Sequence, residues 1–516
     1  MTYLFNDIQK VSKDESANDT TNRIYVDATV SSGAVTVLPD FTTGNFHGEP
    51  YAIDITPVVQ VDGRYGINPL DIQVYTGGGG TATADLSCFK VTCTDTIGSY
   101  TVVRSRRFNS YKAGQSLLAR GYLRFAIPTP GTTQRWGVQN QENAYYIGYN
   151  GLSFGMLHSY DGRVPLYKLT ITSYTGNQTV TLTLNGTAYT ISILTGESIQ
   201  LAAQRIAIAN FNGTWLTTQR GNTVEFLYTG ALGPLGGAFS VSSSGNFVGA
   251  VSTIQAGVVA TNVWIYPGDV DDNGNLFSEL PAWFNGTAFN QYQIKYSWAG
   301  STFFMLNPTT GRYFKFFSHY HIADGITQPQ ISNPAFKVAS MVYNTGGGSG
   351  ISMYTGEMSL FLEGSTTRNT FSRGTAVTQT SLSANELHHL LSIQNAMIFN
   401  NTINTTEAVL QDFTVSMQCN DPTEIYMFID APLTTGVHDF QVVTGHTAGV
   451  SKAIGLLNLA VNEPIASFIV SNTGSSTQFE MVTYRVVVPP GSTLTVAARS
   501  TATMQRAACA LVWYTV

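Results

Sequence analysis

Short segments in which apolar and polar residues alternate recur along most of this chain. From residue 66 onward they include SCFKVTCT, SYTVVRSRRF and AYYIGY, which are rich in aromatic and β-branched residues. An alternation of period two places one face of a strand in a core and the other toward solvent. Asn150-Gly151, Asp161-Gly162 and Asn185-Gly186 separate such runs, and these pairs supply the positive φ angles of tight hairpin turns. The pattern predicts an all-β, multidomain protein of β-sandwich or jelly-roll type.

A chain of 516 residues is long enough for several domains, each with its own core. Changes in composition and in hydrophobic periodicity divide the sequence into four parts. We expect an N-terminal arm at 1–65 that docks to a larger particle, a β-sandwich domain formed by 66–164 plus 263–365, an inserted β-β-α-β-β module at 165–262, and a C-terminal β-sandwich or jelly-roll domain at 366–516. The arm is polar, and such segments usually become ordered by docking on a partner.

The inserted module is recognised by a change from period two to helical spacing. Its first hairpin has Asn185-Gly186 at the tip, and ESIQLAAQRIAIAN follows with apolar residues on one helical face. Thr195 is the expected N-cap of that helix. In the C-terminal part, SANELHHLLSIQNAMIF has the Ser383 and Glu386 pattern of a capping box, but LLSIQ also fits a strand, which we favour. Seven further strand candidates follow, as a sandwich requires.

Charge and composition exclude several classes of function. Charged residues are 11% of the chain, less than half of the ~25% usual for soluble domains. The net charge is −6, and the densest basic cluster is the short run of Arg104, Arg106 and Arg107, so no nucleic-acid groove is expected. The sequence has no run of 18 apolar residues, so no membrane span is expected. Its N-terminus lacks the apolar segment that a signal peptide contains. The four cysteines have no zinc-like spacing and are expected to be unpaired and buried.

The stretch GDVDDNG is the one candidate metal site. Asp269, Asp271 and Asn273 alternate before Gly274, so their oxygens could converge on Ca²⁺. A complete calcium loop would carry a bidentate Glu at position 12, where this chain has Leu280, with Glu279 one place early. Two interpretations remain open: a solvated hairpin loop, which we favour, and a weak structural Ca²⁺ site. No other cofactor is predicted.

Candidate catalytic groups do not form a convincing set. His319 and His321 are two apart in a strand and could share a face, but no third metal ligand follows from spacing. The adjacent His388 and His389 would point to opposite faces. Glu424 and Asp430 share a face but lie about 20 Å apart along a strand, too far for the ~5–9 Å separation of a glycosidase pair. We therefore predict no catalytic residue, and a protein that is not an enzyme.

Aromatic residues could bind sugars by stacking, or could simply fill the core. The candidates are Tyr145, Tyr146 and Tyr149, and the group Trp283, Tyr292 and Trp298. Core packing is the interpretation that we favour for any one of them.

Four segments together resemble a known family. RRFNSYKAGQSLLARGYLRF, AYYIGYNGLSFGMLHSYDGR, YTGNQTVTLTLNGTAYTISILTGES and VVVPPGSTLTVAARSTATMQRAACALVWY occur in this order. They are similar to large β-rich virion structural and tail proteins, fibre-like in part, of tailed bacteriophages and large algal double-stranded DNA viruses. The resemblance covers about residues 70 to 516 and involves fold-forming motifs. It implies a structural or host-contacting part of a particle, with no activity to transfer.

The sequence thus leads to the hypothesis of a non-enzymatic virion structural protein. It would be a tail-fibre, baseplate or capsid-surface component that contributes to particle assembly and host attachment. The expected partners are other virion proteins, further copies of this chain in a trimer, and a host surface glycan or receptor. The alternatives are a minor capsid (cement) protein of a large DNA virus, a glycan-cleaving tail enzyme, and a cellular lectin-like module.

Overall fold

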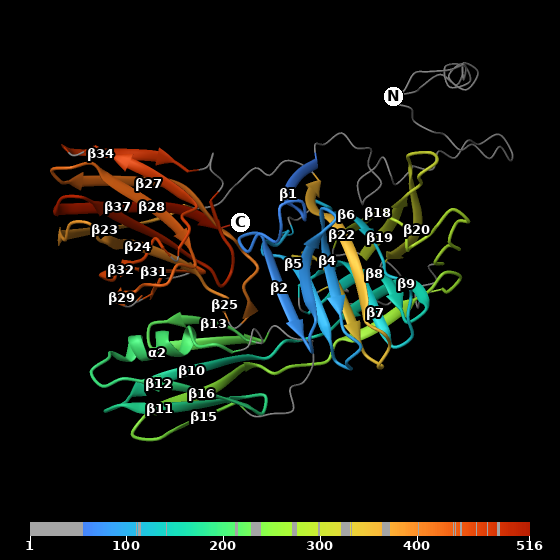
Figure 1. Cartoon of the computed structure of the whole chain (residues 1–516), viewed down its shortest axis with the longest axis horizontal. Helices are drawn as coiled ribbons and strands as arrows, with labels where there is room; N and C mark the ends of the chain where they lie inside the picture. The colour runs from blue at the N-terminus through green and yellow to red at the C-terminus, as the bar shows by residue number, and fades with distance from the viewer. Residues whose placement is uncertain are drawn as a thin grey trace, which may run out of the picture. The chain divides into compact units, whose positions relative to one another are not determined.

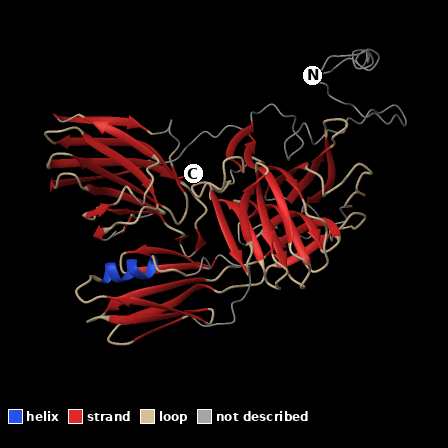
Figure 2. Cartoon of the chain, viewed as in Figure 1, coloured by secondary structure: helices blue, strands red, loops and turns tan. Residues whose placement is uncertain are grey.

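The computed structural model describes residues 55–515, with gaps. The gaps are at 110, 112–114, 141, 212–214, 229–238, 271–275, 298–299, 321–330, 332, 364–371, 401, 437, 439, 444–445, 461, 472 and 482–485. Strands dominate this part of the chain, and Figure 2 shows one short helix among them. The predicted all-β, multidomain fold of sandwich type is confirmed. The described part has no helix that is both long and apolar enough to cross a membrane.

The larger sandwich consists of two antiparallel sheets (Figure 1). The first, here called sheet 1, has the order β20 (Tyr313–Tyr320), β19 (Gly300–Leu306), β18 (Asn290–Ser297), β6 (Leu117–Arg124), β22 (Ile351–Glu363), β4 (Cys88–Cys93) and β3 (Thr81–Asp85). The second, sheet 2, has the order β17 (Thr261–Ile265), β9 (Ser153–Tyr160), β8 (Ala144–Asn150), β7 (Thr132–Gln139), β21 (Lys337–Asn344), β5 (Tyr100–Ser105) and β2 (Ile72–Gly77). Both sheets combine strands from before and after the module.

Residues 1–54 of the expected N-terminal arm lie outside the described residues. Residues 55–62, which we assigned to the same arm, form β1 (Ile55–Asp62) and pair with β22 from Ile55↔Glu363 to Asp62↔Glu357. The run ITPVVQVD alternates as a strand does, and its pairing with β22 supplies the hydrogen bonds that an isolated arm would lack.

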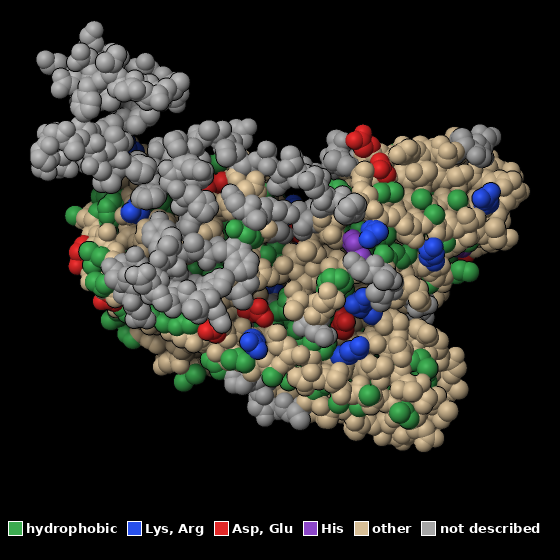
Figure 3. Space-filling model, turned by 180° about the vertical axis from the view of Figure 1, so that it is seen from behind, with side chains coloured by type: hydrophobic (Ala, Val, Ile, Leu, Met, Phe, Trp, Pro, Cys, Tyr) green, Lys and Arg blue, Asp and Glu red, His purple; other side chains and the backbone are tan. Residues whose placement is uncertain are grey.

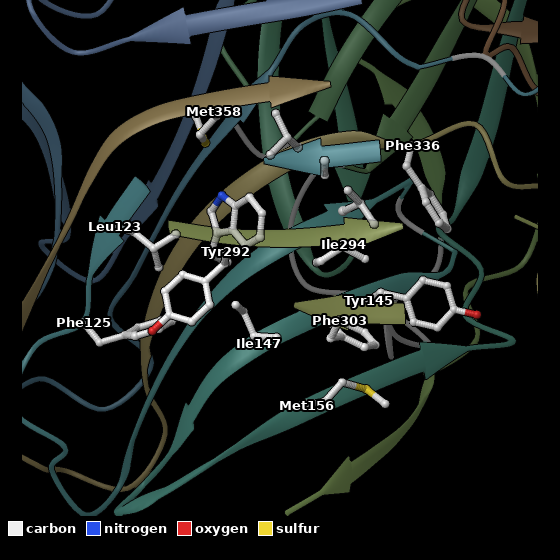
Figure 4. Packing of buried hydrophobic residues seen from close by; sticks show 14 of the residues in the cluster. Leu123, Phe125, Tyr145, Ile147, Met156, Tyr292, Ile294, Phe303, Phe336 and Met358 are labelled. Atoms are coloured by element: carbon white, nitrogen blue, oxygen red, sulfur yellow. The ribbon is translucent and has the colours of Figure 1, made fainter. Parts of the chain in front are cut away.

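The core of the larger sandwich is an aromatic-rich layer between the two sheets. Figure 4 shows Tyr145 and Ile147 from sheet 2 close to Tyr292 and Ile294 from sheet 1. Trp136 is fully buried there, and a Cβ added at Gly121 would lie 2.4 Å from its indole ring. Glycine at 121 therefore leaves in one sheet the space that tryptophan fills from the other. This complementarity fixes how the two sheets face each other.

The inserted module has two small sheets and the helix. The four-stranded sheet has the order β13 (Trp215–Arg220), β14 (Thr223–Tyr228), β10 (Leu166–Ser173) and β16 (Val248–Gln255). The three-stranded sheet has the order β12 (Thr187–Ile193), β11 (Gln178–Leu184) and β15 (Ser240–Ser243). The chain leaves the larger sandwich after β9 and returns at β17, and these two strands pair with each other.

The predicted hairpin tip and helix of the module are present. Asn185 and Gly186 both have positive φ angles, 52° and 77°, as a two-residue turn between β11 and β12 demands. The helix α2 (Ile199–Ala207) buries Ala202, Ala203 and Ile206. Its N-cap is Ser198, whose Oγ accepts a hydrogen bond from the Leu201 N–H, so the prediction of Thr195 was wrong. Ser198 is correctly placed for capping because it directly precedes the first apolar turn.

The C-terminal sandwich also has two sheets. One has the order β23 (Arg373–Leu382), β37 (Met504–Thr515), β27 (Ala408–Gln418) and β34 (Thr473–Glu480), with β35 (Val487–Val488) beside β27. The other includes β29 (Thr435–Gly436), β32 (Gly455–Leu457), β24 (Leu387–Asn395), β36 (Thr493–Ser500), β28 (Thr423–Ile429) and β33 (Ala466–Val470), with β31 (Ala448–Ser451) between β24 and β30 (Gln441–Val442). The strand favoured for LLSIQ is confirmed as part of β24. All four cysteines are unpaired and buried, as predicted.

A buried histidine pair lies in this C-terminal sandwich. His389 Nδ1 is 2.6 Å from the carbonyl oxygen of Ala453, so Nδ1 carries the proton and donates it. Its Nε2 then accepts from the Ser392 hydroxyl at 2.8 Å. The His438 ring centroid is 5.2 Å from that of His389. Burial lowers the pKa of His389 to about 4 and, together with the nearby His389, lowers the pKa of His438 to about 3. Both rings are therefore neutral in the folded protein at pH 7.

Acid is expected to destabilise this sandwich through His389. In the unfolded chain the pKa of a histidine is near 6.5. Below that pH the unfolded state therefore binds a proton at His389, whereas the folded state does not bind it until the pH falls to about 4. The free energy of unfolding should fall between pH 6.5 and about 4, by about 3 kcal/mol from His389 alone. Chemical denaturation of wild type and His389→Gln at pH 7 and 4.5 tests this, because the variant should lose much of the pH dependence. His388→Gln on the opposite face is the control; equal pH dependence in both variants would contradict the prediction.

Uncharged groups dominate the face of the molecule that Figure 3 presents. Figure 3 shows Lys, Arg, Asp and Glu side chains as few and scattered on the face that it presents. This agrees with the charged content of 11% in the sequence.

Candidate functional site

The outer face of sheet 2 carries an unusual row of aromatic and guanidinium groups. Trp264 and Tyr266, two residues apart, stack with ring centroids 6.2 Å apart and an interplanar angle of 5°. The Arg135 guanidinium carbon lies 5.7 Å from the Trp264 ring centre and 5.5 Å from that of Tyr343. Tyr343 in turn stacks on Tyr100 at 5.7 Å and 21°. We call these five residues the aromatic ladder.

Strand register explains how residues so distant in sequence meet. Tyr343 of β21 is directly opposite Tyr100 of β5, and their neighbour Met341 is opposite Arg135 of β7. Directly opposite residues point to the same face of a sheet. Arg135, Tyr343 and Tyr100 therefore project from the same face, and Arg135 extends toward Trp264 across β8 and β9.

Glycines at the positions between the ladder residues leave space above the sheet for the side chains of the ladder. Arg135 is paired with Gly148 on β8, and Gly148 is paired with Gly155 on β9, so no side chain stands between the guanidinium and β17. A Cβ added at Gly155 would lie 2.9 Å from the Tyr266 ring, and one at Gly77 would lie 2.4 Å from the Tyr100 ring. These rings lie close over the sheet because the positions beneath them are glycine.

The rings of the ladder remain partly accessible. Each of its five residues is half-buried, whereas Tyr146, Leu157 and Ala339 between them are buried. A ladder of flat, half-exposed rings with a cation between them offers both apolar faces and hydrogen-bond donors. Such a surface suits a ligand that has C–H faces edged by hydroxyl groups.

Basic groups extend the same face toward β2. The Arg104 Nε atom donates to Gln73 Oε1 at 3.1 Å, and its Nη2 atom donates to the Tyr75 hydroxyl at 2.8 Å. Lys337 Nζ donates to the same Gln73 oxygen at 3.2 Å. Burial, and then the charges of Arg104 and Arg106, hold the pKa of Lys337 well below its usual range. Burial thus disfavours the charged form of Lys337, and the Arg104 guanidinium supplies the positive charge at this end of the face.

No acid neutralises the ladder from within its own face. Among the described residues that are paired across sheet 2 with the ladder or with Arg104 and Lys337, none is a carboxylate. The face is therefore suited to an acidic or neutral ligand rather than to a cation.

Glu142, in the turn between β7 and β8, is a carboxyl group with a perturbed pKa. Those two strands carry Arg135 and Tyr146, and β8 begins two residues after Glu142. Burial raises the pKa of Glu142, against the hydrogen bond from Gln255 Nε2 at 3.3 Å and the charge of Arg163, both of which lower it. A carboxyl group whose pKa is raised holds its proton to a higher pH than an exposed one does, as a general acid requires.

The module contributes one tyrosine to the surroundings of the ladder. The pKa of Tyr228 is raised by burial first and then by the nearby hydroxyls of Tyr100 and Tyr343. Burial also raises the pKa values of Tyr100 and Tyr343 themselves. The three hydroxyl groups therefore stay protonated and can donate hydrogen bonds.

The sequence-predicted calcium stretch is described only at its edges. Asp271 and Asn273 lie outside the described residues. The Asp269 carboxylate accepts a hydrogen bond from the Tyr266 N–H at 3.0 Å, and Val270 and Leu276 form a β-bridge. Glu279 Oε1 would be 2.9 Å from a Cβ at Gly268. The described ends thus close a hairpin, and the weak Ca²⁺ site stays a prediction.

The candidate histidines and carboxylates do not assemble into a site. His319 packs among Tyr145, His158 and Phe317 in the core, and His321 lies outside the described residues. Glu424 binds Arg499, with the Arg499 Nη2 atom 2.6 Å from its Oε2 atom. Asp430 binds Arg106 at 2.9 Å. The two carboxylates that share β28 or its end are thus held by different arginines and form no acid–base pair. No group of three or more metal-ligating side chains occurs in the described part of the chain.

The aromatic residues singled out from sequence mostly fill the core. Tyr145, Tyr149 and Tyr292 are buried there, and Trp283 packs against it. Trp298 lies outside the described residues. Only Tyr146 reaches the outer face of sheet 2, because it alternates with Tyr145 along β8.

The ladder was missed from sequence because its members come from four strands. One local signal existed: Trp264 lies in β17 and Tyr266 directly follows its last residue, so extended backbone brings the two rings, two residues apart, to the same face. The other three residues meet them only through the strand order.

Comparisons with known proteins give a distant likeness. No family model matches the chain, and no curated protein matches it. Among solved structures, an immunostimulatory antigen and pseudo β-1,3-glucanase of Mycobacterium tuberculosis is similar, with 11% identity, 60% of this chain and 100% of that chain covered, and a TM-score of 0.29. An endo-1,3-β-glucanase from Streptomyces sioyaensis has 10% identity, with 60% of this chain and 97% of that chain covered, and a TM-score of 0.30. The cellulose-induced protein Cip1 has 8% identity, with 59% of this chain and 96% of that chain covered, and a TM-score of 0.26.

These neighbours correct the functional prediction. The hypothesis of a non-enzymatic virion structural protein is contradicted: several of the solved structures found similar are named as glucanases or as a glycoside hydrolase family protein. The prediction that the chain is not an enzyme is contradicted by the same finding. At such identities and TM-scores the likeness assigns neither a reaction nor a substrate to this chain. The resemblance of the sequence to virion proteins, and the virion as its location, stay predictions.

Proposed function

We propose that this chain acts on glycans: it binds a polysaccharide along the aromatic ladder and cleaves it. The observation that carries the proposal is the ladder itself, in which four half-buried rings and Arg135 stack in sequence across sheet 2. A pyranose ring has a flat face of C–H groups that packs on an aromatic ring, and hydroxyl groups at its edge that accept hydrogen bonds from guanidinium and phenol groups. Repeated rings across several strands match repeated sugars.

Positive charge on the same face favours an acidic polysaccharide. Arg135 lies within the ladder, and Arg104 lies on the same side of sheet 2. Carboxylate or sulfate groups on a sugar would be attracted to these groups, and no carboxylate among the described residues paired with them opposes this. We therefore expect tighter binding to uronate-containing or sulfated glycans than to neutral ones.

Cleavage of a glycosidic bond requires a group that gives a proton to the departing oxygen. Glu142 is the carboxyl group beside the ladder strands whose pKa burial raises, so it holds its proton to a higher pH than an exposed carboxyl. We assign it the role of proton donor. In the described part of the chain Glu142 forms hydrogen bonds with Asn140 and Gln255, neither of which is a carboxylate, so the group that activates water is left unassigned.

The ladder can be tested by removing single rings. Trp264→Ala and Tyr343→Ala should each weaken binding to an acidic polysaccharide about tenfold or more, because stacking on one ring is worth about 1–3 kcal/mol. Affinity electrophoresis and calorimetry with alginate, pectate and neutral β-glucan would measure the binding, and assays for new reducing ends would measure cleavage. Both variants should retain the melting temperature of the wild type within a few degrees.

A ring on the other sheet serves as a matched control. Tyr354 of β22 also lies under a guanidinium, with Arg124 at 4.4 Å from its ring centre, but on the outer face of sheet 1. Tyr354→Ala should leave glycan binding unchanged. Equal losses in Tyr354→Ala and Trp264→Ala, or no binding of wild type to any glycan, would contradict the proposal.

A further inference from the structure

A separate hollow lies at the open edge of the C-terminal sandwich. Its volume is about 480 Å³, and its walls include Thr375, Val443, Val450, Lys452 and Ala453. β23, which carries Thr375, is an edge strand of one sheet, whereas β30 and β31 belong to the other. The hollow therefore lies between the two sheets, where their edges part. Its size falls in the range of small-molecule sites.

Inward-facing side chains of β23 lead into this edge. Residues 373, 375, 377 and 379 alternate toward the partner sheet, where Val377 packs on the core. Gln379 is buried, and its amide donates to the Leu390 and Ala453 carbonyls at 3.3 and 3.5 Å. These bonds connect β23 to β24 and to Ala453, which lines the hollow.

Buried polar groups lie near Arg373, the residue that precedes Gly374 and Thr375 in the lining of the hollow. Arg373 is paired in register with Trp513 of β37, whose ring centroid is 6.0 Å from that of His446. Trp513 is 1% exposed and His446 is 7% exposed. Within the described part of the chain, Trp513 Nε1, His446 Nε2 and Thr447 Oγ1 are buried without a hydrogen-bond partner. Buried polar atoms of this kind usually have partners, so three of them together call for an explanation.

The chemistry around the hollow favours an acceptor-rich ligand. Lys452 brings a cation and Thr375 a hydroxyl group. None of the residues that line the hollow is acidic. Val443, Val450 and Ala453 add an apolar wall on one side. A ligand that combines a carboxylate with a compact ring would satisfy both walls.

We propose that this hollow is a second binding site, which takes a small carboxylate ligand of about the size of one sugar residue, such as a free uronic acid or a chain-terminal one. The carboxylate binds Lys452 and the Thr375 hydroxyl, and the C–H face of the ring packs on Val443, Val450 and Ala453. The site does not depend on the aromatic ladder, which belongs to the other sandwich. No bond is made or broken in it.

The test uses the full chain and three probes. Glucuronate, glucose and acetate are titrated by calorimetry and by ligand-observed saturation-transfer NMR. Glucuronate should bind. Glucose, which lacks the charge, and acetate, which lacks the ring, should each bind at least tenfold more weakly than glucuronate. Lys452→Met and Thr375→Val should each weaken glucuronate binding at least tenfold. Lys452 is exposed, so its variant is expected to fold normally.

Controls separate this site from the ladder. Lys168→Met changes a lysine of the inserted module and should not alter glucuronate binding, and Trp264→Ala should not alter it either. Loss of binding in Trp264→Ala with normal binding in Lys452→Met would place the ligand on the ladder and overturn this proposal while supporting the other. Equal affinity for glucose and glucuronate, or no binding of glucuronate, would also overturn it.

Discussion

Replacing Lys295 with methionine is expected to lower the free energy of unfolding of the larger sandwich by about 3–5 kcal/mol. Lys295 Nζ lies 3.6 Å from Glu363 Oε1, and both side chains are only 3% exposed. The substitution removes the ammonium group and leaves the Glu363 carboxylate buried without this counter-charge. Burial of a carboxylate that has lost its ion partner is among the costliest changes in a protein interior. Urea denaturation monitored by intrinsic fluorescence would measure the loss.

Two controls show whether the loss of stability comes from the Glu363 carboxylate that Lys295→Met leaves without its counter-charge. The double variant Lys295→Met, Glu363→Leu removes both charges and should recover most of the stability, since an apolar pair of similar volume is often as stable as a buried ion pair. Lys90→Met breaks a surface pair in which Lys90 Nζ is 3.5 Å from Asp85 Oδ2, with side chains 33% and 42% exposed, and should cost less than about 1 kcal/mol. The prediction fails if Lys295→Met costs no more than Lys90→Met.

Glu142→Gln is expected to reduce glycan cleavage by about 10²–10⁴-fold, the usual contribution of general acid catalysis, while leaving binding to the ladder unchanged. The amide keeps the shape of the carboxyl group and can still contact Gln255, but it has no proton to give at the glycosidic oxygen. The substitution therefore separates proton donation from ligand contact. Release of reducing ends from the polysaccharide that wild type binds best, with affinity measured in parallel, is the required experiment.

The pH profile gives this prediction a second readout. A general acid must be protonated, so wild-type activity should decline as pH rises through the pKa of Glu142, which burial places above the usual range for a carboxyl. Residual activity of Glu142→Gln should lack that limb. Glu357→Gln changes an exposed carboxyl on β22 and should leave both rate and profile as in wild type. Unchanged cleavage by Glu142→Gln would remove Glu142 from the reaction.

The strands were readily predicted from sequence because alternation and turn chemistry act locally. Asn185-Gly186 demanded positive φ angles whatever surrounded them, and LLSIQ was rightly preferred as a strand although Ser383 and Glu386 form a capping-box pattern. In the structure the Ser383 hydroxyl contacts both Glu386 and His388, so the same two side chains support a turn before β24. The helix start was displaced by three residues, since Thr195, Glu197 and Ser198 all resemble capping residues.

The aromatic ladder could not be predicted, because it depends on which strands are neighbours. Residues 100, 135, 264 and 343 are brought together by the order β17-β9-β8-β7-β21-β5, and nothing in their local sequence encodes that order. The glycines that clear its path are equally ambiguous in sequence. Gly148 and Gly155 flank Asn150-Gly151, where they would be interpreted as turn residues, yet both belong to strands.

The functional prediction failed for a related reason. The search for a glycosidase pair considered carboxylates that share one strand, and Glu424 and Asp430 proved to be held by separate arginines. Glu142 was not considered because a single Glu in a turn carries no sequence signal. Its relevance comes from burial and from the strands that the turn connects.

The pairing of β9 with β17 has a consequence for how this chain can change over evolutionary time. Tyr160, the last residue of β9, is directly opposite Thr261, the first residue of β17. The two points where the module joins the larger sandwich are therefore one cross-strand pair apart, a gap that a tight turn could bridge. Residues 161–260 can therefore vary in number at a cost in loop-closure entropy that grows only with the logarithm of loop length. The pairing of β9 with β17 thus leaves the host sheet tolerant of insertions of different length at this point.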